Sequence, residues 1–135
     1  MANSAASDSP KRRKIVYPGT FDPPHLGHMD LIFRGHQLFD ELVVAVAVNR
    51  GKSFTFDEDE RVALLKKCIG DTPGIKIVAF DGLVVDLLEQ QNASCFLRGI
   101  RTFSDFEAEY TMALTNRQMT GAETIFVLPT LEYSH

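Results

Sequence analysis

Residues 41–48 read ELVVAVAV, and every residue after Glu41 in this stretch is apolar. A run that is this short, this apolar and this rich in valine is typical of a strand buried on both faces. Such strands belong to parallel sheets that carry helices on either side. The stretch therefore predicts an α/β protein, and the patterns on both sides of it extend that prediction.

Strand and helix patterns alternate outward from this stretch. The further predicted strands are residues 15–17, 75–80, 94–97 and 124–128. Four segments with helical spacing separate them: one holds Met29, Ile32, Phe33 and His36, a second Val62, Leu65 and Ile69, a third Leu83, Val84, Leu87 and Leu88, and the last runs from Ser104 to about Asn116. Thr55 with Glu58 and Ser104 with Glu107 are predicted capping boxes that open two of these helices. The order βαβαβαβαβ with short connections predicts a Rossmann-like, open, parallel five-stranded sheet with helices on both faces. In such a sheet, ligands bind at the carboxyl ends of the strands.

The composition limits the class of protein. The chain has 135 residues, of which 44% are hydrophobic and 24% charged, and a formal net charge of −4. These values suit one globular domain at residues 14–135, preceded by a disordered polar and basic tail at residues 1–13. The net negative charge does not favour nucleic acid, and no apolar run has the length of a membrane span. Cys68 and Cys95 lack metal-site spacing, so we expect both to be buried thiols of a reduced, cytoplasmic protein.

The first group of chemically competent residues lies in residues 17–28, YPGTFDPPHLGH, between a strand and a helix. His25 and His28 fall at the helix N-terminus, where free N–H groups and the helix dipole attract phosphate. Gly27 lets a polyphosphate approach the backbone, and Thr20 adds a hydroxyl donor. The alternative is a pair of helix-entry histidines with ordinary hydrogen bonds. A metal site is less favoured, because no carboxylate or cysteine completes it.

A lysine follows the second strand. Lys52 lies in the loop after residues 41–48, where its ammonium can neutralise an incoming phosphate. The alternative interpretation is a solvated surface charge.

Two arginines follow the fourth strand, in the run Arg98, Gly99, Ile100 and Arg101, just before the helix that bears Glu109. Their fork-shaped donors suit phosphate oxygens. The alternative is a pair of surface arginines bound to Asp105 and Glu107. All three groups fall at the same edge of the predicted sheet, and this convergence favours a phosphate-binding site there.

These motifs carry a resemblance to a known family. YPGTFDPPHLGH resembles the signature of the HxGH nucleotidyltransferases. FDEDERVAL, RGIRTFSDFEAEYTMALTNR and FVLPTLEYS follow in the order and spacing of the phosphopantetheine adenylyltransferase family, to which the chain is similar from about Lys14 to Ser134. The resemblance implies adenylyl transfer from ATP to 4′-phosphopantetheine, which gives dephospho-coenzyme A and pyrophosphate with Mg²⁺ assisting. It also implies a homo-hexamer.

The resemblance further implies roles for individual residues. The implied catalytic residues are His28, Lys52 and Arg101. The implied contacts to ATP are Thr20, Phe21, His28, Gly99, Ile100, Arg101, Glu109, Tyr133 and Ser134. The implied contacts to the acceptor are Thr20, Lys52, Leu83, Val84 and Arg98. For Leu83 and Val84, the alternative to lining the pantetheine arm is a place in the helix core.

The chain departs from the family at its C-terminal end. It stops at His135, whereas the family continues with a serine-rich stretch and further helices. We therefore expect either a fragment of a longer protein or a shortened form with a weaker hold on ATP. Two other functions stay open: a non-catalytic module that binds a nucleotide or coenzyme A, and an HxGH nucleotidyltransferase with a different acceptor.

Overall fold

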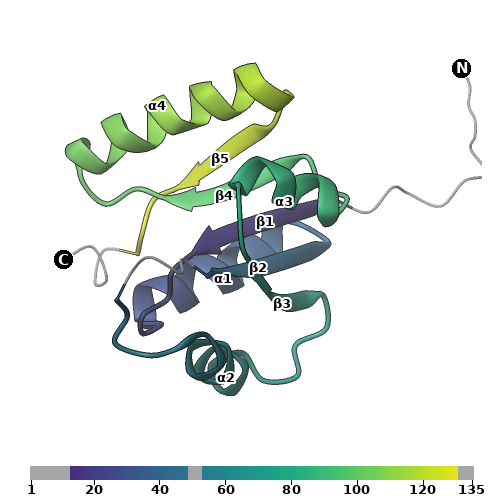
Figure 1. The fold of residues 1–135 in the computed structure, drawn as a ribbon, viewed down its shortest axis with the longest axis vertical. Coiled ribbons are helices and arrows are strands. Elements are labelled where there is room, and N and C mark those ends of the chain that lie inside the picture. Colours follow the sequence, from purple (N-terminus) through teal and green to yellow (C-terminus); the bar gives the residue numbers. More distant parts are fainter. Residues whose placement is uncertain (1–12, 49–52, 131–135) are drawn as a thin grey trace, which may run out of the picture.

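The computed structural model describes residues 13–48 and 53–130. Its sheet is made of β1 (Lys14–Gly19), β2 (Glu41–Ala47), β3 (Ile75–Phe80), β4 (Cys95–Gly99) and β5 (Glu123–Val127). The five strands are all parallel and lie in the order β3-β2-β1-β4-β5 (Figure 1). This arrangement confirms the predicted open, parallel, five-stranded sheet. The chain progresses outward from β1 in one direction through β2 and in the other through β4, so a crevice opens at the carboxyl ends of β1 and β4.

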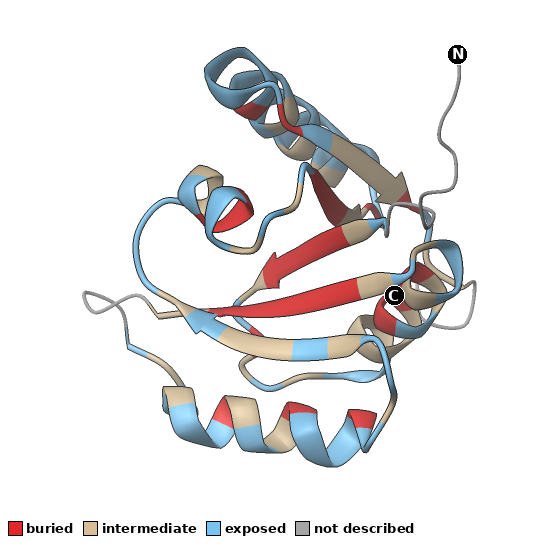
Figure 2. Cartoon of the chain, turned by 90° about the vertical axis from the view of Figure 1, so that its right-hand side faces the viewer, coloured by how far each residue is buried: buried red, intermediate tan, exposed pale blue. Residues whose placement is uncertain are grey.

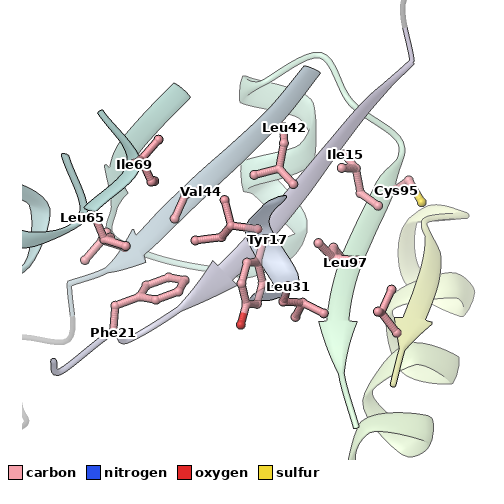
Figure 3. Packing of buried hydrophobic residues seen from close by; sticks show 13 residues of the cluster. Ile15, Tyr17, Phe21, Leu31, Leu42, Val44, Leu65, Ile69, Cys95 and Leu97 are labelled. Atoms are coloured by element: carbon pink, nitrogen blue, oxygen red, sulfur yellow. The ribbon is translucent and has the colours of Figure 1, made fainter. Parts of the chain in front are cut away.

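Four helices connect the strands: α1 (Leu26–Leu38), α2 (Glu58–Ile69), α3 (Val84–Gln90) and α4 (Phe103–Thr120). Successive residues of a strand face opposite sides of the sheet, and this alternation separates two cores. Ile15 and Tyr17 pack with side chains of α1 and α2 (Figure 3). Val16 packs on the other face with Leu87 and Leu88 of α3. The prediction of helices on both faces is therefore confirmed.

β2 is the most deeply buried strand, as its sequence predicts. Residues 42–46 are each at most 2% exposed (Figure 2). Leu65 and Ile69 of α2 and Leu31 and Ile32 of α1 cover one side of the sheet. Burial of each such aliphatic side chain stabilises the folded state by roughly 1.5–3 kcal/mol. This apolar layer therefore keeps in place the strands whose carboxyl ends form the site.

Both predicted capping boxes are wrong. The N-cap of α2 is Asp57, which accepts a hydrogen bond from the Glu60 N–H, while the Glu60 side chain accepts from the Asp57 N–H. The N-cap of α4 is Thr102, whose hydroxyl accepts from the Asp105 N–H at 3.0 Å. Thr55 lies in the turn before α2, where its own N–H donates to Asp22 Oδ2 at 2.7 Å.

Two predictions about burial are also wrong. Cys68 is exposed on α2, whereas Cys95 is buried, as predicted. Burial, together with the nearby Glu123 carboxylate, raises the pKa of Cys95 to about 11. Leu83 precedes α3 and is 63% exposed, so it does not belong to the helix core.

The ends of the predicted domain are only partly described. Arg13 donates its N–H to Asp40 Oδ2 and accepts hydrogen bonds at its carbonyl from the N–H groups of Asp40 and Glu41. The predicted tail at residues 1–13 and domain at residues 14–135 stay predictions, since residues 1–12 and 131–135 lie outside the described part. Among the helices that the structure describes, none is long and apolar enough to cross a bilayer.

α4 packs on β5, and much of its own surface is exposed (Figure 2). Asn116 is its only buried residue. The large apolar side chains that α4 exposes are Phe103, Phe106, Tyr110, Met112, Leu114 and Met119.

Candidate active site

The turn between β1 and α1 places the histidines of the first motif. Phe21 has a positive φ of 53°, a conformation that costs a residue with a side chain roughly 1–2 kcal/mol. Its ring is 2% exposed and packs edge-on against the rings of Tyr17 and His28, with centroids 5.3 and 4.8 Å away. The packing of the Phe21 ring offsets the cost of the positive φ, and its contact with the His28 ring helps to hold that ring in place. Gly19 leaves room for the Phe21 ring, because a Cβ on it would lie 3.0 Å from that ring and would press against it.

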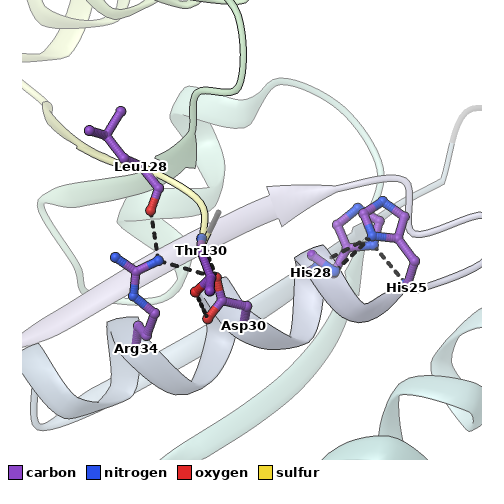
Figure 4. A network of polar contacts seen from close by, with 7 residues as sticks. His25, His28, Asp30, Arg34, Leu128 and Thr130 are labelled. Carbon is purple, nitrogen blue, oxygen red and sulfur yellow. Dashed lines mark hydrogen bonds and ion pairs between the residues drawn. The ribbon is translucent and has the colours of Figure 1, made fainter. Parts of the chain in front are cut away.

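His25 and His28 form a capping box with each other at the start of α1 (Figure 4). The His25 N–H donates to His28 Nδ1 at 3.1 Å, and His25 Nδ1 accepts from the N–H groups of Gly27 and His28 at 3.1 and 3.4 Å. The two rings stack with their centroids 3.6 Å apart. Because each Nδ1 accepts a hydrogen bond, each neutral ring carries its proton on Nε2. The ordinary hydrogen bonds that the sequence allowed are thus present, and they leave an N–H donor on each ring.

The surroundings of His28 keep it neutral. Burial lowers its pKa most, and the charges of His25, Arg101 and Arg98 lower it further, to about 4. Burial and Arg101 also lower the pKa of His25. At pH 7 the His28 ring is therefore a hydrogen-bond donor without a net charge.

Arg98 of β4 and Glu109 of α4 form a bidentate ion pair. Arg98 Nε and Nη2 donate to the two Glu109 oxygens at 2.8 and 2.7 Å, and Nη1 donates to the Pro18 carbonyl at 2.6 Å. The hydrogen bond from Glu109 raises the pKa of Arg98. The alternative in which the arginines bind Asp105 and Glu107 is therefore wrong for Arg98. Arg101 is exposed, and its side chain has no hydrogen bond or ion pair to another described residue.

A polar pocket of about 270 Å³ lies at the carboxyl ends of β1, β4 and β5. We call it the polar pocket; its lining includes Thr20, His25, Gly27, His28, Asp30, Gly99, Ile100, Arg101 and Asp105. Three of its side chains, His25, His28 and Arg101, are donors without a carboxylate partner in the part of the chain that the structure describes. The pocket therefore favours an anion.

A second pocket, of about 400 Å³, adjoins the first between the sheet and α4. We call it the apolar pocket; its lining includes Ala47, Phe80, Val84, Phe96, Ala108, Met112 and Ala113. Both pockets are lined by Pro18, Gly19, Thr20, Arg98 and Glu109. An elongated ligand with an apolar arm and an anionic end can therefore place that end at Thr20 and Arg98.

Asp30 of α1 lines the polar pocket and belongs to a network of polar contacts (Figure 4). Its carboxylate accepts hydrogen bonds from the Thr130 N–H and hydroxyl at 3.1 and 2.9 Å and from Arg34 at 3.1 Å. Arg34 also donates to the Leu128 carbonyl. Burial alone raises the pKa of Asp30, but the hydrogen bonds from Thr130 and Arg34 outweigh it and lower the pKa. The sequence analysis missed Asp30; its signal is a carboxylate two residues beyond His28 in the same helix.

The structure brings most of the predicted site residues together. The polar pocket contains Thr20, His28, Gly99, Ile100, Arg101 and Glu109, and the apolar pocket contains Thr20, Val84 and Arg98. Phe21 lies in the core below His28, and the exposed Leu83 lines neither pocket. Lys52, Tyr133 and Ser134 lie outside the described residues. The sequence analysis also missed Phe80, Phe96 and Met112, whose pattern is that of ordinary core residues.

The chain has known relatives. A model of the cytidylyltransferase-like family matches residues 16–135. The crystal structure of a lipopolysaccharide core biosynthesis protein from Thermoplasma volcanium shares the fold, with a TM-score of 0.62 at 23% identity over 89% of this chain and 98% of that one. The chain is thus a nucleotidyltransferase of the cytidylyltransferase-like class.

The more similar relatives narrow this class. The phosphopantetheine adenylyltransferase of Aquifex aeolicus is 46% identical over 123 residues, which make up 91% of this chain and 76% of the relative. That of Syntrophotalea carbinolica is 46% identical over 125 residues, or 92% of this chain and 75% of the relative. The chain belongs to the phosphopantetheine adenylyltransferase family, as the resemblance of its motifs predicts.

Proposed function

We propose that the protein transfers the adenylyl group of ATP to 4′-phosphopantetheine and so forms dephospho-coenzyme A and pyrophosphate in coenzyme A biosynthesis. The family supports this reaction. The observation that carries it is the junction of the two pockets, where Thr20 and Arg98 lie between a polar and an apolar cavity. The triphosphate of ATP occupies the polar pocket, and the pantetheine arm occupies the apolar pocket.

The reaction is an in-line displacement at the α-phosphorus of ATP. A phosphate oxygen of the acceptor forms a bond to this phosphorus while the bond to the β-bridging oxygen breaks, and pyrophosphate leaves with the electron pair. No covalent intermediate on the protein is needed, so the residues act by positioning and by stabilising charge. The neutral His28 donates from Nε2 to a phosphate oxygen and stabilises the charge that develops there. Arg101, which has no carboxylate partner among the described residues, adds positive charge at the same pocket.

The ATP and acceptor contacts implied for the remaining residues belong to the same proposal. Val84 and Arg98 contact the acceptor, and Gly99, Ile100 and Glu109 contact ATP. Glu109 also orients Arg98, since both of its oxygens are bound by that guanidinium. Phe21 contacts ATP through its main chain, because its ring is buried.

Mg²⁺ enters this proposal with ATP. No three histidine, cysteine or carboxylate side chains come close enough to form a metal site among residues 13–48 and 53–130. The carboxylates of Asp30 and Glu109 already accept hydrogen bonds from Thr130, Arg34 and Arg98. Mg²⁺ is commonly bound through substrate phosphates with few protein ligands, which suits this site. When bound, the ion neutralises charge on the triphosphate and on the leaving pyrophosphate.

Cellular context and assembly complete the proposal. We place the protein in the cytoplasm and propose a homo-oligomer, a hexamer by family resemblance. The exposed apolar side chains of α4 support assembly, because large exposed apolar surfaces commonly mark interfaces. Lys52, Tyr133 and Ser134 remain proposed contacts on the strength of the family motifs.

The test is pyrophosphate release from ATP, Mg²⁺ and 4′-phosphopantetheine by the purified chain. We expect His28→Asn to lower kcat by about 100-fold or more, since it loses the Nε2 donor but retains an acceptor for the His25 N–H. His36→Asn, in the same helix but outside both pockets, is the matched control and keeps wild-type activity.

The outcomes separate the hypotheses. A cooperatively folded wild type that releases no pyrophosphate contradicts the proposed function. If pyrophosphate is released with another phosphorylated acceptor but not with 4′-phosphopantetheine, the chain is a nucleotidyltransferase with a different acceptor.

A further inference from the structure

Arg61 on α2 is a buried cation without a carboxylate partner among the described residues. It is 1% exposed, and none of the carboxylates in the described part of the chain lies within salt-bridge distance. Buried charges in proteins are ordinarily paired, because removing an ion from water costs several kcal/mol. Such a buried cation next to a site that favours anions suggests a role in that site.

The guanidinium of Arg61 binds backbone carbonyls from three segments. Nη1 donates to the carbonyls of Thr20 and Ala47 at 2.8 and 2.9 Å, and Nε donates to the carbonyl of Phe56 at 3.2 Å. The Phe54 ring lies 4.2 Å from the guanidinium carbon and adds a cation–π contact. Arg61 therefore joins the turn after β1, the end of β2 and the turn before α2.

Two of these carbonyls matter for the pockets. Thr20 lines both pockets, and Ala47 lines the apolar one. Carbonyl oxygens at the carboxyl ends of parallel strands carry partial negative charge, which repels phosphate. Arg61 binds the Thr20 and Ala47 oxygens toward α2, which contributes no residue to either pocket. The Thr20 side chain is then left to face an anion, with a full positive charge behind it.

Asp22 makes a second connection between the same turns. Its two oxygens accept from the N–H groups of Thr55 and Phe56 at 2.7 and 2.8 Å. Asp22 and Arg61 bind backbone groups rather than each other, so the charge of Arg61 is not cancelled by an ion pair with Asp22. The turn is thus held firmly while the positive charge persists.

We propose that Arg61 is a positioning residue for anion binding at the junction of the two pockets. It fixes the carbonyls of Thr20 and Ala47 away from the ligand and supplies positive charge behind Thr20, without touching the substrate. The inference rests on the proposed function for the identity of the anion, a phosphate group of ATP or of 4′-phosphopantetheine, since Thr20 lines both pockets.

The experiment compares an anionic probe with an uncharged one. The dissociation constants of pyrophosphate and adenosine are measured by calorimetry for the wild type, Arg61→Gln and Arg61→Lys. We expect Arg61→Gln to weaken pyrophosphate binding about tenfold and to leave adenosine binding within about twofold. Arg61→Lys keeps the charge but not the fork, so it restores part of the affinity. Lys66→Gln, which removes an exposed charge from the same helix, is the matched control and binds both probes as the wild type does.

A merely structural role predicts a different result. Equal loss of affinity for both probes, or wild-type affinity for both, in a cooperatively melting Arg61→Gln overturns the proposal, as does a wild type that binds no pyrophosphate. If Arg61→Gln does not fold, Arg61→Lys decides: a pyrophosphate dissociation constant raised about threefold with adenosine unchanged supports the proposal, and wild-type values for both overturn it. Binding is measured without turnover, so a wild type that binds pyrophosphate but transfers nothing contradicts only the proposed function.

Discussion

The chemistry of His28 depends on its hydrogen bonds, which cannot be read from the identity of the residue alone. The motif indicates that His28 can donate to a phosphate, and the structure adds which nitrogen does so. Nδ1 is occupied by the His25 N–H, and the burial of the ring and the arginines near it favour the neutral form. Asp30 and Arg61 show the same limit, because their partners Thr130 and Thr20 are distant in the sequence.

The lowered pKa of His28 makes stability depend on pH. Its pKa is about 4 in the folded protein and near 6.5 in the unfolded chain, so between these values the unfolded chain binds the additional proton. Stability from this group is complete above pH 6.5 and is lost as the pH falls toward 4. We expect the wild type to lose about 2 kcal/mol more than His28→Asn between pH 7 and pH 4.5, in urea unfolding at both values. An equal loss in both proteins contradicts the lowered pKa.

At the scale of elements, the start of a helix depends on which hydroxyl meets a free N–H group. Ser104 with Glu107 and Thr102 with Asp105 are both plausible patterns in the sequence. The backbone turns into α4 one residue after Thr102, so Ser104 already lies inside the helix and is exposed. Hydrophobic periodicity predicts that a helix exists here, while its first residue depends on how the chain leaves β4.

The two hydroxyls provide a matched pair of variants. Thr102→Ala removes the acceptor of the Asp105 N–H, and we expect it to destabilise the protein by about 1 kcal/mol. Ser104→Ala removes an exposed hydroxyl within the helix, and we expect a change within about 0.5 kcal/mol. Urea unfolding at pH 7 measures both, and a larger effect of Ser104→Ala would restore the capping box expected from the sequence.

At the scale of the whole molecule, the central strands and the β5 edge of the sheet differ in how they are covered. β1 and β2 lie between helices, whereas α4 packs on β5 (Figure 1). This 18-residue helix leaves large apolar side chains exposed. Leu114 and Met119 are 45% and 63% exposed. Apolar surface of this kind favours burial against another copy of the chain, which accords with the proposed homo-oligomer.

Sedimentation equilibrium tests this proposal. We expect the wild type to sediment as an assembly larger than a monomer, and Leu114→Lys to shift it to smaller species, because a buried lysine at an interface lacks a partner. Leu38→Lys, on α1 at a similarly exposed position, is the control and leaves the mass unchanged. A monomeric wild type, or equal effects of both variants, contradicts assembly through α4.

The fold and much of the site follow from the sequence, whereas the electrostatic state of the site does not. The apolar run at residues 41–48 and the alternation around it determine a parallel sheet, and the end of a parallel strand determines where His28, Arg98 and Arg101 gather. These features follow from local periodicity and from the direction of the strands. Only the tertiary structure decided that Arg98 pairs with Glu109, that His28 is neutral, and that Arg61 is buried among carbonyls. Charge, tautomer and burial depend on contacts between residues far apart in the chain, and those contacts exist only after the sheet and its helices have packed together.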